Sequence, residues 1–163
     1  MPGQCREWLQ GIGELAAIMS AVLSVTQPAL YALNRECLLR LSERPELRDH
    51  LSAWGFAFNA VTVVSNRLSP NHRDRKSGRP EYCDVLMSLG GDAETVLDLV
   101  TLGIRCRYSS GSAAVFSGNV ILHGVSESVN DRVCIAGYTR PAVHCSVGVG
   151  ATTWVTLDEL IDK

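Results

Sequence analysis

Residues 58–74 read FNAVTVVSNRLSPNHRD, and this stretch decides how the rest of the chain is interpreted. Its first half is rich in β-branched residues, which favour strands. Its second half is broken by Pro70 and ends in His72-Arg73-Asp74. Because residues two apart in an extended chain project to the same side, His72 and Asp74 can reach one metal ion together. The stretch therefore predicts a strand that leads into a metal-binding motif.

The sequence downstream of this stretch consists of short β-rich runs separated by turn residues. Turn signals such as Gly90-Gly91-Asp92 and Ser117-Gly118-Asn119 lie between the runs. About seven evenly spaced strands favour an antiparallel sandwich or barrel over alternating βα units. The predicted strands are Phe58–Ser65, Asp84–Leu89, Val96–Val100, Ile104–Tyr108, Ala113–Phe116, Asn119–His123 and Arg132–Tyr138.

The sequence upstream, over about residues 4–50, has a helical pattern. A second helix is expected to begin near Gln27-Pro28, since proline suits a first turn, and to run to Leu41. The charged residues of this helix fall mostly on its other side, which indicates a solvated face. The tail from Thr153 to Lys163 predicts a short helix capped by Thr156 or Asp158, or a frayed end. The apolar face of the first helix comprises Trp8, Leu9, Ile12, Leu15, Ala16, Met19 and Leu23.

Length and composition favour one soluble domain over residues 1–163, with 1–52 as helical support, 56–148 as the β-rich main part and 149–163 as a tail. The apolar fraction of 46% and the charged fraction of 20% are ordinary for a globular protein. A net charge of −2 gives no global attraction to nucleic acid or to an acidic membrane. The longest apolar stretch, Leu15–Val25, is too short to span a bilayer. The six cysteines form no CxxC pair, which favours reduced thiols.

The residues that carry chemistry occur in the order His72, Asp74, His123 and Arg132. Two imidazoles and one carboxylate form the facial triad of non-haem Fe(II) oxygenases, which leaves coordination sites open for cosubstrate and O₂. His123 lies 49 positions after Asp74, at the end of an apolar run, and Arg132 follows nine residues later. A guanidinium pairs bidentately with a carboxylate, and Cys134, Ala136 and Tyr138 share its predicted strand face.

Each of these residues also has a plainer interpretation. A His-x-Asp pair occurs by chance in a chain with four histidines. His123 could be an ordinary strand-end histidine, and Arg132 a surface cation beside Asp131. The combination in this order, on a chain of short strands, favours the metal site.

The stretch Phe58–Asp74 resembles the iron-binding region of the TET and base-J-binding-protein oxygenase superfamily, and most closely its compact fungal branch. The resemblance covers roughly residues 56–148 and agrees in motif order and spacing. It continues through Gly78–Asp84, Leu102-Gly103-Ile104, Ser117-Gly118, Leu122–Val125 and Asp131–Cys134.

This resemblance implies an α+β, mostly β fold, with a double-stranded β-helix (jelly-roll) core and N-terminal helices packed on one sheet. It implies Fe(II) and 2-oxoglutarate as cofactors, with His72, Asp74 and His123 as iron ligands and Arg132, together with Cys134, on the cosubstrate side. Asn66 is added because related AlkB-like repair enzymes have a cosubstrate-binding asparagine on the strand before the metal motif.

Asn59 is a weaker cosubstrate candidate, and a hydrogen-bonded strand polar residue explains it equally well. The chain departs from the family pattern at Val100-Thr101, where a Pro-Gly is expected. It departs again at Ser109–Ser112, where a Pro-Gly-Thr turn is expected. Both places are strand-connecting turns, so they affect loop shape more than chemistry.

The resemblance also implies oxidation of a methyl group on a DNA base, most typically 5-methylcytosine, by a 2-oxoglutarate-dependent dioxygenase. A basic loop around the metal motif suits phosphate contacts, although a solvated loop is the alternative. We expect Arg75 to face the substrate, and Arg73, which points away from its two ligand neighbours, to be structural or substrate-facing. A flipped base needs a stacking aromatic, and Tyr82, Tyr108 and Tyr138 are the candidates, Tyr82 being preferred. The five cations of the loop are Arg67, Arg73, Arg75, Lys76 and Arg79.

The alternatives left open are the same chemistry on thymine, N6-methyladenine or an RNA base, a non-catalytic jelly-roll binding domain, and a small-molecule oxygenase. The last would leave the basic loop unexplained. Methylated DNA is the expected partner and no membrane is expected, whereas the oligomeric state is left open. The substrate alone suggests a nuclear location.

Overall fold

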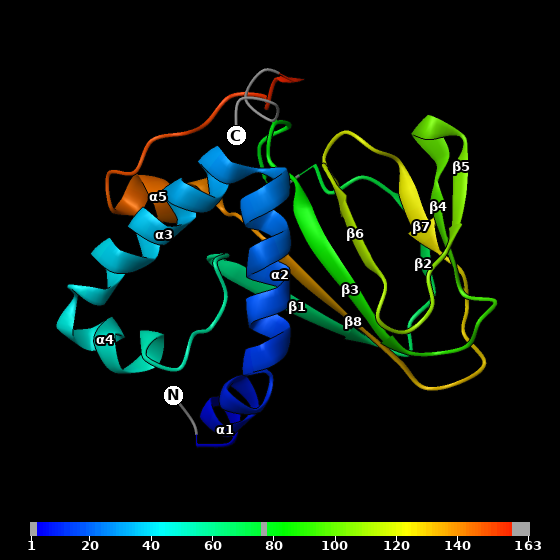
Figure 1. Ribbon diagram of the computed structural model, residues 1–163, viewed down its shortest axis with the longest axis horizontal. Coiled ribbons are helices and arrows are strands. Elements are labelled where there is room, and N and C mark those ends of the chain that lie inside the picture. Colours follow the sequence, from blue (N-terminus) through cyan, green and yellow to red (C-terminus); the bar gives the residue numbers. More distant parts are fainter. Residues whose placement is uncertain (1–2, 76–77, 158–163) are drawn as a thin grey trace. The chain divides into compact units, whose positions relative to one another are not determined.

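The structure is a computed structural model that describes residues 3–75 and 78–157. The chain forms two compact units (Figure 1). One comprises residues 60–138 and is called here the sheet unit. The other is built from both ends of the chain, residues up to 59 and from 139 onward, and is called here the helical unit.

The sheet unit contains two sheets of four strands each, and every pairing within them is antiparallel. This arrangement confirms the predicted jelly-roll core, a double-stranded β-helix (Figure 1). The first sheet, in spatial order, consists of β1 (Ala60–Ser65), β8 (Arg132–Tyr138), β3 (Asp84–Gly90) and β6 (Ala113–Phe116). The second consists of β2 (Ser69–His72), β7 (His123–Val125), β4 (Val96–Leu99) and β5 (Ile104–Arg107).

The core of the sheet unit takes side chains from both sheets. Leu97 and Val125 come from the second sheet and Phe116 from the first, and they pack with Tyr108, which follows β5. Tyr108 and Leu97 are each only 2% exposed. Burying a large apolar side chain contributes roughly 1.5–3 kcal/mol, so this cluster accounts for much of the attraction between the two sheets.

Two strands differ from the sequence-based expectation. The predicted strand Asn119–His123 is wrong in position, because residues 117–121 turn back through hydrogen bonds from Val120 and Ile121 N–H to the Ser117 carbonyl. The strand begins instead at His123, as β7. The short β2 was not predicted, and it pairs with β7 through Ser69 with Val125 and His72 with His123, across an irregularity.

The helical unit contains α1 (Gly3–Gly11), α2 (Gly13–Thr26), α3 (Pro28–Ser42), α4 (Pro45–Leu51) and α5 (Pro141–Ser146). The second predicted helix is confirmed as α3, with Pro28 in its first turn. The first predicted helix is split, because α1 and α2 meet at an angle of 60° around Ile12. A glycine flanks Ile12 on each side, and each glycine in a helix interior costs about 1 kcal/mol relative to alanine. The apolar face predicted for the first helix is still buried on both sides of the bend, through Leu9 in α1 and Ala16, Met19 and Leu23 in α2.

Over the residues described, no single helix has the length and apolar content needed to cross a bilayer. The bent pair α1–α2 meets that requirement on length and composition only.

An apolar cluster and a buried polar network join α3 to α5. Cys37 and Leu41 of α3 pack against Val149, which follows α5. Beside them, the Asn34 side chain exchanges hydrogen bonds with the Thr139 hydroxyl at 2.8 and 3.1 Å and meets Nε2 of His144 at 2.8 Å. All three polar side chains are at most 1% exposed. The helix α5 was not predicted from the sequence.

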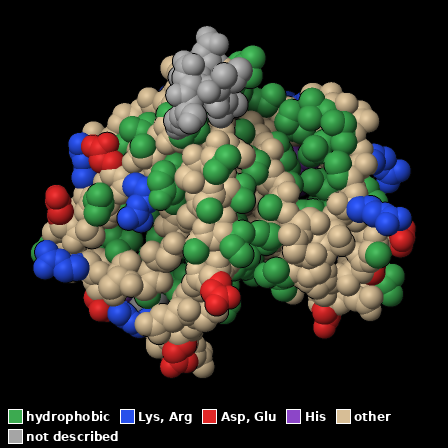
Figure 2. All heavy atoms as spheres, viewed as in Figure 1, with side chains coloured by type: hydrophobic (Ala, Val, Ile, Leu, Met, Phe, Trp, Pro, Cys, Tyr) green, Lys and Arg blue, Asp and Glu red, His purple; other side chains and the backbone are tan. Residues whose placement is uncertain are grey.

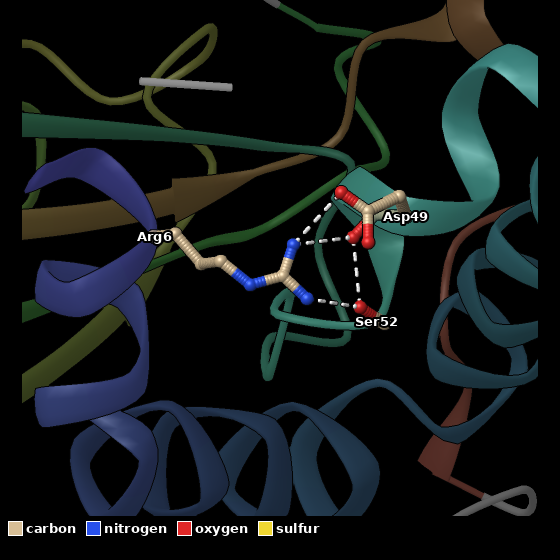
Figure 3. Close-up of polar contacts among 3 residues, drawn as sticks. All are labelled: Arg6, Asp49 and Ser52. Carbon is tan, nitrogen blue, oxygen red and sulfur yellow. Dashed lines mark hydrogen bonds and ion pairs between the residues drawn. The ribbon is translucent and has the colours of Figure 1, made fainter. Parts of the chain in front are cut away.

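A surface contact joins α1 to α4 (Figure 3). The Arg6 guanidinium donates to the Asp49 carboxylate at 3.0 Å, to the Asp49 carbonyl at 3.1 Å and to the Ser52 hydroxyl at 2.9 Å. The Asp49 side chain is largely exposed and that of Arg6 partly exposed, so the pair contributes at most about 1 kcal/mol. The predicted C-terminal helix lies mostly outside the described residues.

Candidate metal centre

Three side chains of the sheet unit converge on one point. They are His72 at the end of β2, Asp74 two residues later and His123 at the start of β7. One ligand atom from each lies within 4.8 Å of the other two. Nε2 of His72 is 3.7 Å from Oδ1 of Asp74, and Nε2 of His123 is 3.6 Å from Oδ2. Two imidazoles and a carboxylate therefore surround a space of the size that a metal ion needs.

Backbone carbonyls orient both imidazoles. Nδ1 of His72 lies 2.7 Å from the carbonyl of Pro70, and Nδ1 of His123 lies 2.9 Å from that of Ile121. A carbonyl only accepts, so each Nδ1 carries the proton and donates it. The lone pair of a neutral ring is then on Nε2, the atom that faces Asp74. Burial lowers the pKa of His123, and the neighbouring His72 lowers it further, which also favours the neutral ring.

Asp74 reaches the site from a loop and not from a strand. We expected His72 and Asp74 to share a strand, but β2 ends at His72. The Asp74 N–H donates to the carbonyl of Gly118 at 2.8 Å, which fixes the loop instead. Gly118 has to be small, because a Cβ there would lie 2.8 Å from Oδ2 of both Asp74 and Asp84.

Hydrogen bonds between three loops hold the residues next to the metal-ligand candidates in place. The N–H of Leu122, the neighbour of His123, donates to the Thr101 hydroxyl at 2.8 Å. Arg73 donates to the Val120 carbonyl at 2.9 Å and reaches the same hydroxyl at 3.4 Å. Thr101 belongs to the short 3-10 helix η1 (Val100–Leu102), at a place where the chain departs from the family pattern. The structure thus places Arg73 against these loops, in line with the structural one of the two roles expected for it.

The triad opens into a cavity of about 230 Å³ between the two sheets. Alternate residues of β8 line one wall of this cavity, which confirms the face predicted from the sequence. They are Arg132, Cys134, Ala136 and Tyr138.

Arg132 is a buried cation without a carboxylate partner among the described residues, and only 5% of it is exposed. Its Nε donates to the hydroxyl of Ser88 at 3.0 Å, and its guanidinium carbon lies 4.9 Å from the ring centre of Tyr108. Its Nη2 has no hydrogen-bond partner in the part of the chain described. Because a buried charge is costly unless it is paired, this guanidinium calls for an anionic ligand.

Cys134 lies beside Arg132 on the cavity wall and is 7% exposed. Burial raises the pKa of its thiol above the ordinary value, although the Tyr108 hydroxyl and the Arg132 charge oppose this. Burial likewise raises the pKa of Tyr108. Both groups therefore stay neutral at ordinary pH and surround the guanidinium without neutralising it.

Asn66 lies outside the lining of this cavity and holds the start of β8. Its Oδ1 accepts the Arg132 N–H at 2.6 Å and its Nδ2 donates to the Asp131 carboxylate at 2.8 Å, with φ at +47°. It therefore positions the backbone of Arg132. Asn59, the weaker candidate, belongs to the helical unit. Its Nδ2 donates to the carbonyl of Arg140, and its Oδ1 accepts the N–H of the same residue.

The three candidate aromatic residues differ in burial and in whether they line the cavity. Tyr82 is 2% exposed and lies outside the cavity lining, and Tyr108 is equally buried beneath Arg132. Tyr138 is half-buried and lines the cavity. Of the basic loop, Arg75 and Arg67 are exposed, Arg79 pairs with Glu81 at 2.8 Å, and Lys76 falls outside the described residues.

Asp84 is a cavity residue that the sequence interpretation missed as a site residue. It begins β3 and lines the cavity beside Asp74. Burial raises its pKa to about 7, the Asp74 charge adds to the rise, and a hydrogen bond with the backbone of Gly118 opposes it. Its position in the resembling segment Gly78–Asp84 was the available signal, but spacing alone does not show which way a strand residue points.

The donor set suits a divalent iron. Two imidazoles and one carboxylate on one side of an ion leave the opposite side open, and this combination is typical of non-haem Fe(II) oxygenases. Nη2 of Arg132, which has no hydrogen-bond partner among the described residues, lines the same cavity and suits the far carboxylate of a dicarboxylate cosubstrate. The residues present therefore fit iron and 2-oxoglutarate.

A double-stranded β-helix with this triad and a buried arginine defines the class of 2-oxoglutarate oxygenase folds. The sequence profile of the Tet/JBP family, described as the oxygenase domain of the 2OGFeDO superfamily, matches residues 2–141, and the chain belongs to this family. The resemblance noted in the sequence is thereby confirmed. No curated protein matches the chain significantly.

A solved structure with a similar fold is NgTET1 in complex with 5mC DNA, at 16% sequence identity and a TM-score of 0.60. The match covers 85% of this chain and 52% of that chain, so this chain spans about half the length of that protein. At this identity the likeness concerns the fold alone.

Proposed function

We propose that the protein is an Fe(II)- and 2-oxoglutarate-dependent dioxygenase that oxidises the methyl group of a nucleic-acid base, 5-methylcytosine in DNA being the first choice. One observation carries the proposal: a buried guanidinium whose Nη2 has no hydrogen-bond partner among the described residues and a two-histidine, one-carboxylate cluster face the same cavity. Together they form complementary halves of a site for a metal and a dicarboxylate.

In this proposal, Nε2 of His72, Nε2 of His123 and one Asp74 oxygen hold the iron. Iron, when bound, supplies the activation of O₂ at the expense of 2-oxoglutarate. The protein orients the two imidazoles through the carbonyls of Pro70 and Ile121, so that both would present Nε2 to an ion. The adjacent ring of Phe116 meets that of His123 edge-on at 4.8 Å, which restricts how that ligand can tilt.

Arg132 would bind the distal carboxylate of 2-oxoglutarate. Ser88 fixes its Nε and the Tyr108 ring supports the guanidinium plane, so the free Nη2 is held in place before the ligand arrives. Such preorganisation reduces the entropy lost on binding. The neutral thiol of Cys134 fills the wall next to this group without competing for its charge.

Several features support a nucleic-acid substrate. NgTET1 was solved with 5mC DNA, and Arg67 and Arg75 lie exposed around the metal motif of this chain. Figure 2 shows further Lys and Arg side chains at the outer edge of the sheet unit near β5, where Arg105 and Arg107 are exposed. Exposed cations of this kind suit the phosphate backbone, although the net charge is −2.

A base in duplex DNA must leave the stack before its methyl group can reach a buried metal. We infer that Tyr138 contacts the flipped base, since it is the half-buried candidate on the cavity wall. This replaces Tyr82, which is buried elsewhere. A DNA substrate also implies a nuclear location, which a localisation experiment with the tagged chain would test.

The test is to incubate the purified protein with Fe(II), 2-oxoglutarate and a methylated oligonucleotide, and to measure succinate and oxidised bases by mass spectrometry. We expect both products, and neither with His72→Ala. Succinate with a small molecule but no base oxidation would favour a small-molecule oxygenase. Absence of both products, with the metal bound, would favour a non-catalytic binding domain.

A further inference from the structure

The carbonyl of Ile121 is the group that orients the imidazole of His123. It accepts the hydrogen bond from Nδ1 at 2.9 Å, and the ring then presents Nε2 to the Asp74 carboxylate. The carbonyl belongs to the planar peptide unit that joins Ile121 to Leu122. A rotation of that unit would therefore tilt the ring and move Nε2, so the backbone on either side has to be held.

This backbone lies in a turn, residues 117–122, between β6 and β7. Within the turn, the N–H groups of Val120 and Ile121 both donate to the Ser117 carbonyl, at 3.1 and 2.9 Å. Those two bonds involve neither the Val120 carbonyl nor the Leu122 N–H, which are the polar groups of the peptide units on either side of the Ile121 carbonyl. Side chains from two other loops bind both of them.

Arg73 holds the upstream side of the Ile121 peptide. Its Nε donates to the Val120 carbonyl at 2.9 Å. In the sequence Arg73 stands between the metal-ligand candidates His72 and Asp74, so its side chain connects the loop of two ligands to the turn that leads to the third. The guanidinium is a rigid plane, and its Nη2 lies 3.4 Å from the Thr101 hydroxyl.

Thr101 holds the downstream side of the same peptide. Its hydroxyl oxygen accepts the Leu122 N–H at 2.8 Å. A threonine hydroxyl has two acceptor lone pairs, so the same oxygen can also accept from Arg73. Thr101 belongs to η1, directly after β4, and the last residue of that strand, Leu99, pairs with His123. The anchor is therefore attached to the strand beside the ligand that it serves.

These contacts contribute little to the fold, and one of them lies outside the family pattern. Arg73 and Thr101 are both exposed and do not line the cavity, and replacements of surface side chains change stability little. Thr101 stands where the family pattern has the glycine of a Pro-Gly pair, and neither residue of that pair has a hydroxyl. The bond to Leu122 is thus a feature of this chain.

We propose that Arg73 and Thr101 are positioning residues for His123, because they fix the Ile121 peptide from both sides and thereby fix the direction of the imidazole. This inference rests on the proposed function, since it concerns the same metal site. Neither side chain touches the ion, and both act through the backbone. Their removal should therefore change the metal site without loosening the fold.

The experiment measures the metal site itself. Mn(II) binding to the metal-free protein would be followed by electron paramagnetic resonance, and the visible spectrum of the Co(II)-loaded protein would report the ligand geometry. Thr101→Val keeps the side-chain shape and loses the acceptor. We expect its Mn(II) affinity to fall roughly tenfold, the lower end of the range for residues that support a metal ligand, because the contact is exposed. The Co(II) absorption bands should shift as well.

Two further variants serve as rescue and control. Thr101→Ser keeps the hydroxyl and should restore both the Mn(II) affinity and the Co(II) spectrum. Thr153→Val changes an exposed threonine of the helical unit and should behave as the wild type does. The thermal unfolding midpoints of all the metal-free variants should stay close to that of the wild type.

Arg73→Lys tests the upstream side independently. Lysine keeps the charge but has a single donor group in place of the planar fork, so we expect a similar loss of Mn(II) affinity. Because both residues hold one peptide, the double variant with Thr101→Val should lose less than the two single losses combined. If Thr101→Val fails to fold, Arg73→Lys decides by the same two readouts.

The outcomes separate the two proposals. Wild-type affinity and spectrum in Thr101→Val or in Arg73→Lys would overturn the positioning role and leave the dioxygenase intact. A loss that Thr101→Ser does not restore would do the same, and so would a lowered midpoint in the metal-free variants, which would indicate a role in folding. Fully additive losses in the double variant would overturn the shared action on one peptide. A wild type that binds neither ion would overturn the proposed function and this inference with it.

Discussion

Arg132 carries a charge that the described protein does not pair, and its replacement tests what the cavity binds. We expect Arg132→Lys to weaken 2-oxoglutarate binding roughly tenfold to hundredfold, because an ammonium cannot keep both the Ser88 contact and a bidentate pair with a carboxylate. Calorimetric titration of 2-oxoglutarate into the Mn(II)-loaded protein, without O₂, measures this directly. The exposed Arg105→Lys serves as control. Unchanged affinity in Arg132→Lys would place the cosubstrate anchor elsewhere.

Replacing Gly118 tests whether this residue sets the position of the Asp74 carboxylate. In Gly118→Ala, the added methyl group would lie 2.8 Å from the Oδ2 atoms of Asp74 and Asp84, so one carboxylate has to move. Changes next to metal ligands typically cost 10–100-fold in affinity, and we expect Mn(II) binding, followed by electron paramagnetic resonance, to weaken by about that factor. Gly13→Ala, at a helical position with no atom within 4 Å of the added carbon, should bind as the wild type does. Equal affinities in the two variants would contradict this account.

The proposed metal ligands and Arg132 were candidates from their residue types and order, and the family resemblance was needed to prefer them over the plainer interpretations. Asp84 and Gly118 could not be predicted, since their importance lies in two carboxylate oxygens, from separate parts of the chain, that approach the place where a Cβ on Gly118 would lie. Asn66 shows the opposite case. A polar residue at a suggestive position turns out to hold the backbone of Arg132, and only the direction of its side chain reveals this.

At the scale of elements, strands rich in β-branched and apolar residues were predictable and strands defined by their partners were not. β1, β3 and β8 were predicted almost to their ends, because they are compact runs of such residues between turn signals. β2 has the sequence Ser-Pro-Asn-His and lacks that pattern, and its pairing depends on β7. The split between α1 and α2 went unpredicted because the apolar spacing continues through the bend.

Helix α5 is coupled to α3 through His144, and this contact should make the helical unit sensitive to acid. Burial lowers the pKa of His144, although the backbone of Gly150 and the Glu36 charge oppose the effect. The unfolded chain therefore takes up the proton more readily. The stabilising contribution is complete above the unfolded pKa of about 6.5 and is lost as the pH falls through the lower folded value.

Thermal unfolding followed by tryptophan fluorescence measures this effect, because Trp8, Trp54 and Trp154 all belong to the helical unit. The midpoint should fall when the pH is lowered from about 7.5 to about 5.5, and His144→Gln, which does not titrate there, should flatten that dependence. A wild type and a variant with parallel pH profiles would show that His144 is not the group responsible.

At the scale of the whole molecule, the sheet unit is inserted into the helical unit. The chain leaves the helices at residue 59 and returns to them at residue 139. No pattern in the sequence predicted this return, and the predicted catalytic span of 56–148 runs past the last strand and through α5. Residues 141–149 join the helical unit because Val143 and Val149 pack against α3 residues such as Cys37, a contact between segments more than 100 positions apart.

The metal centre links β2 to β7 and, through Gly118, to the start of β3, so an ion bound there should stabilise the sheet unit as a whole. A ligand that binds only the folded state stabilises it by RT ln(1 + [L]/Kd), which is about 2.7 kcal/mol at a hundred times Kd. Amide hydrogen exchange in β3 and β8 should then slow by up to roughly a hundredfold on adding Mn(II), wherever exchange requires the site to open. His72→Ala should abolish the Mn(II) effect while leaving exchange in the metal-free protein close to that of the wild type, because His72 is exposed at the end of an edge strand. The contrary result is equally fast exchange in β3 and β8 with and without Mn(II), at a concentration where binding is independently observed. It would mean that the ion binds outside the sheets and that the three ligands do not stabilise the sheet unit through it.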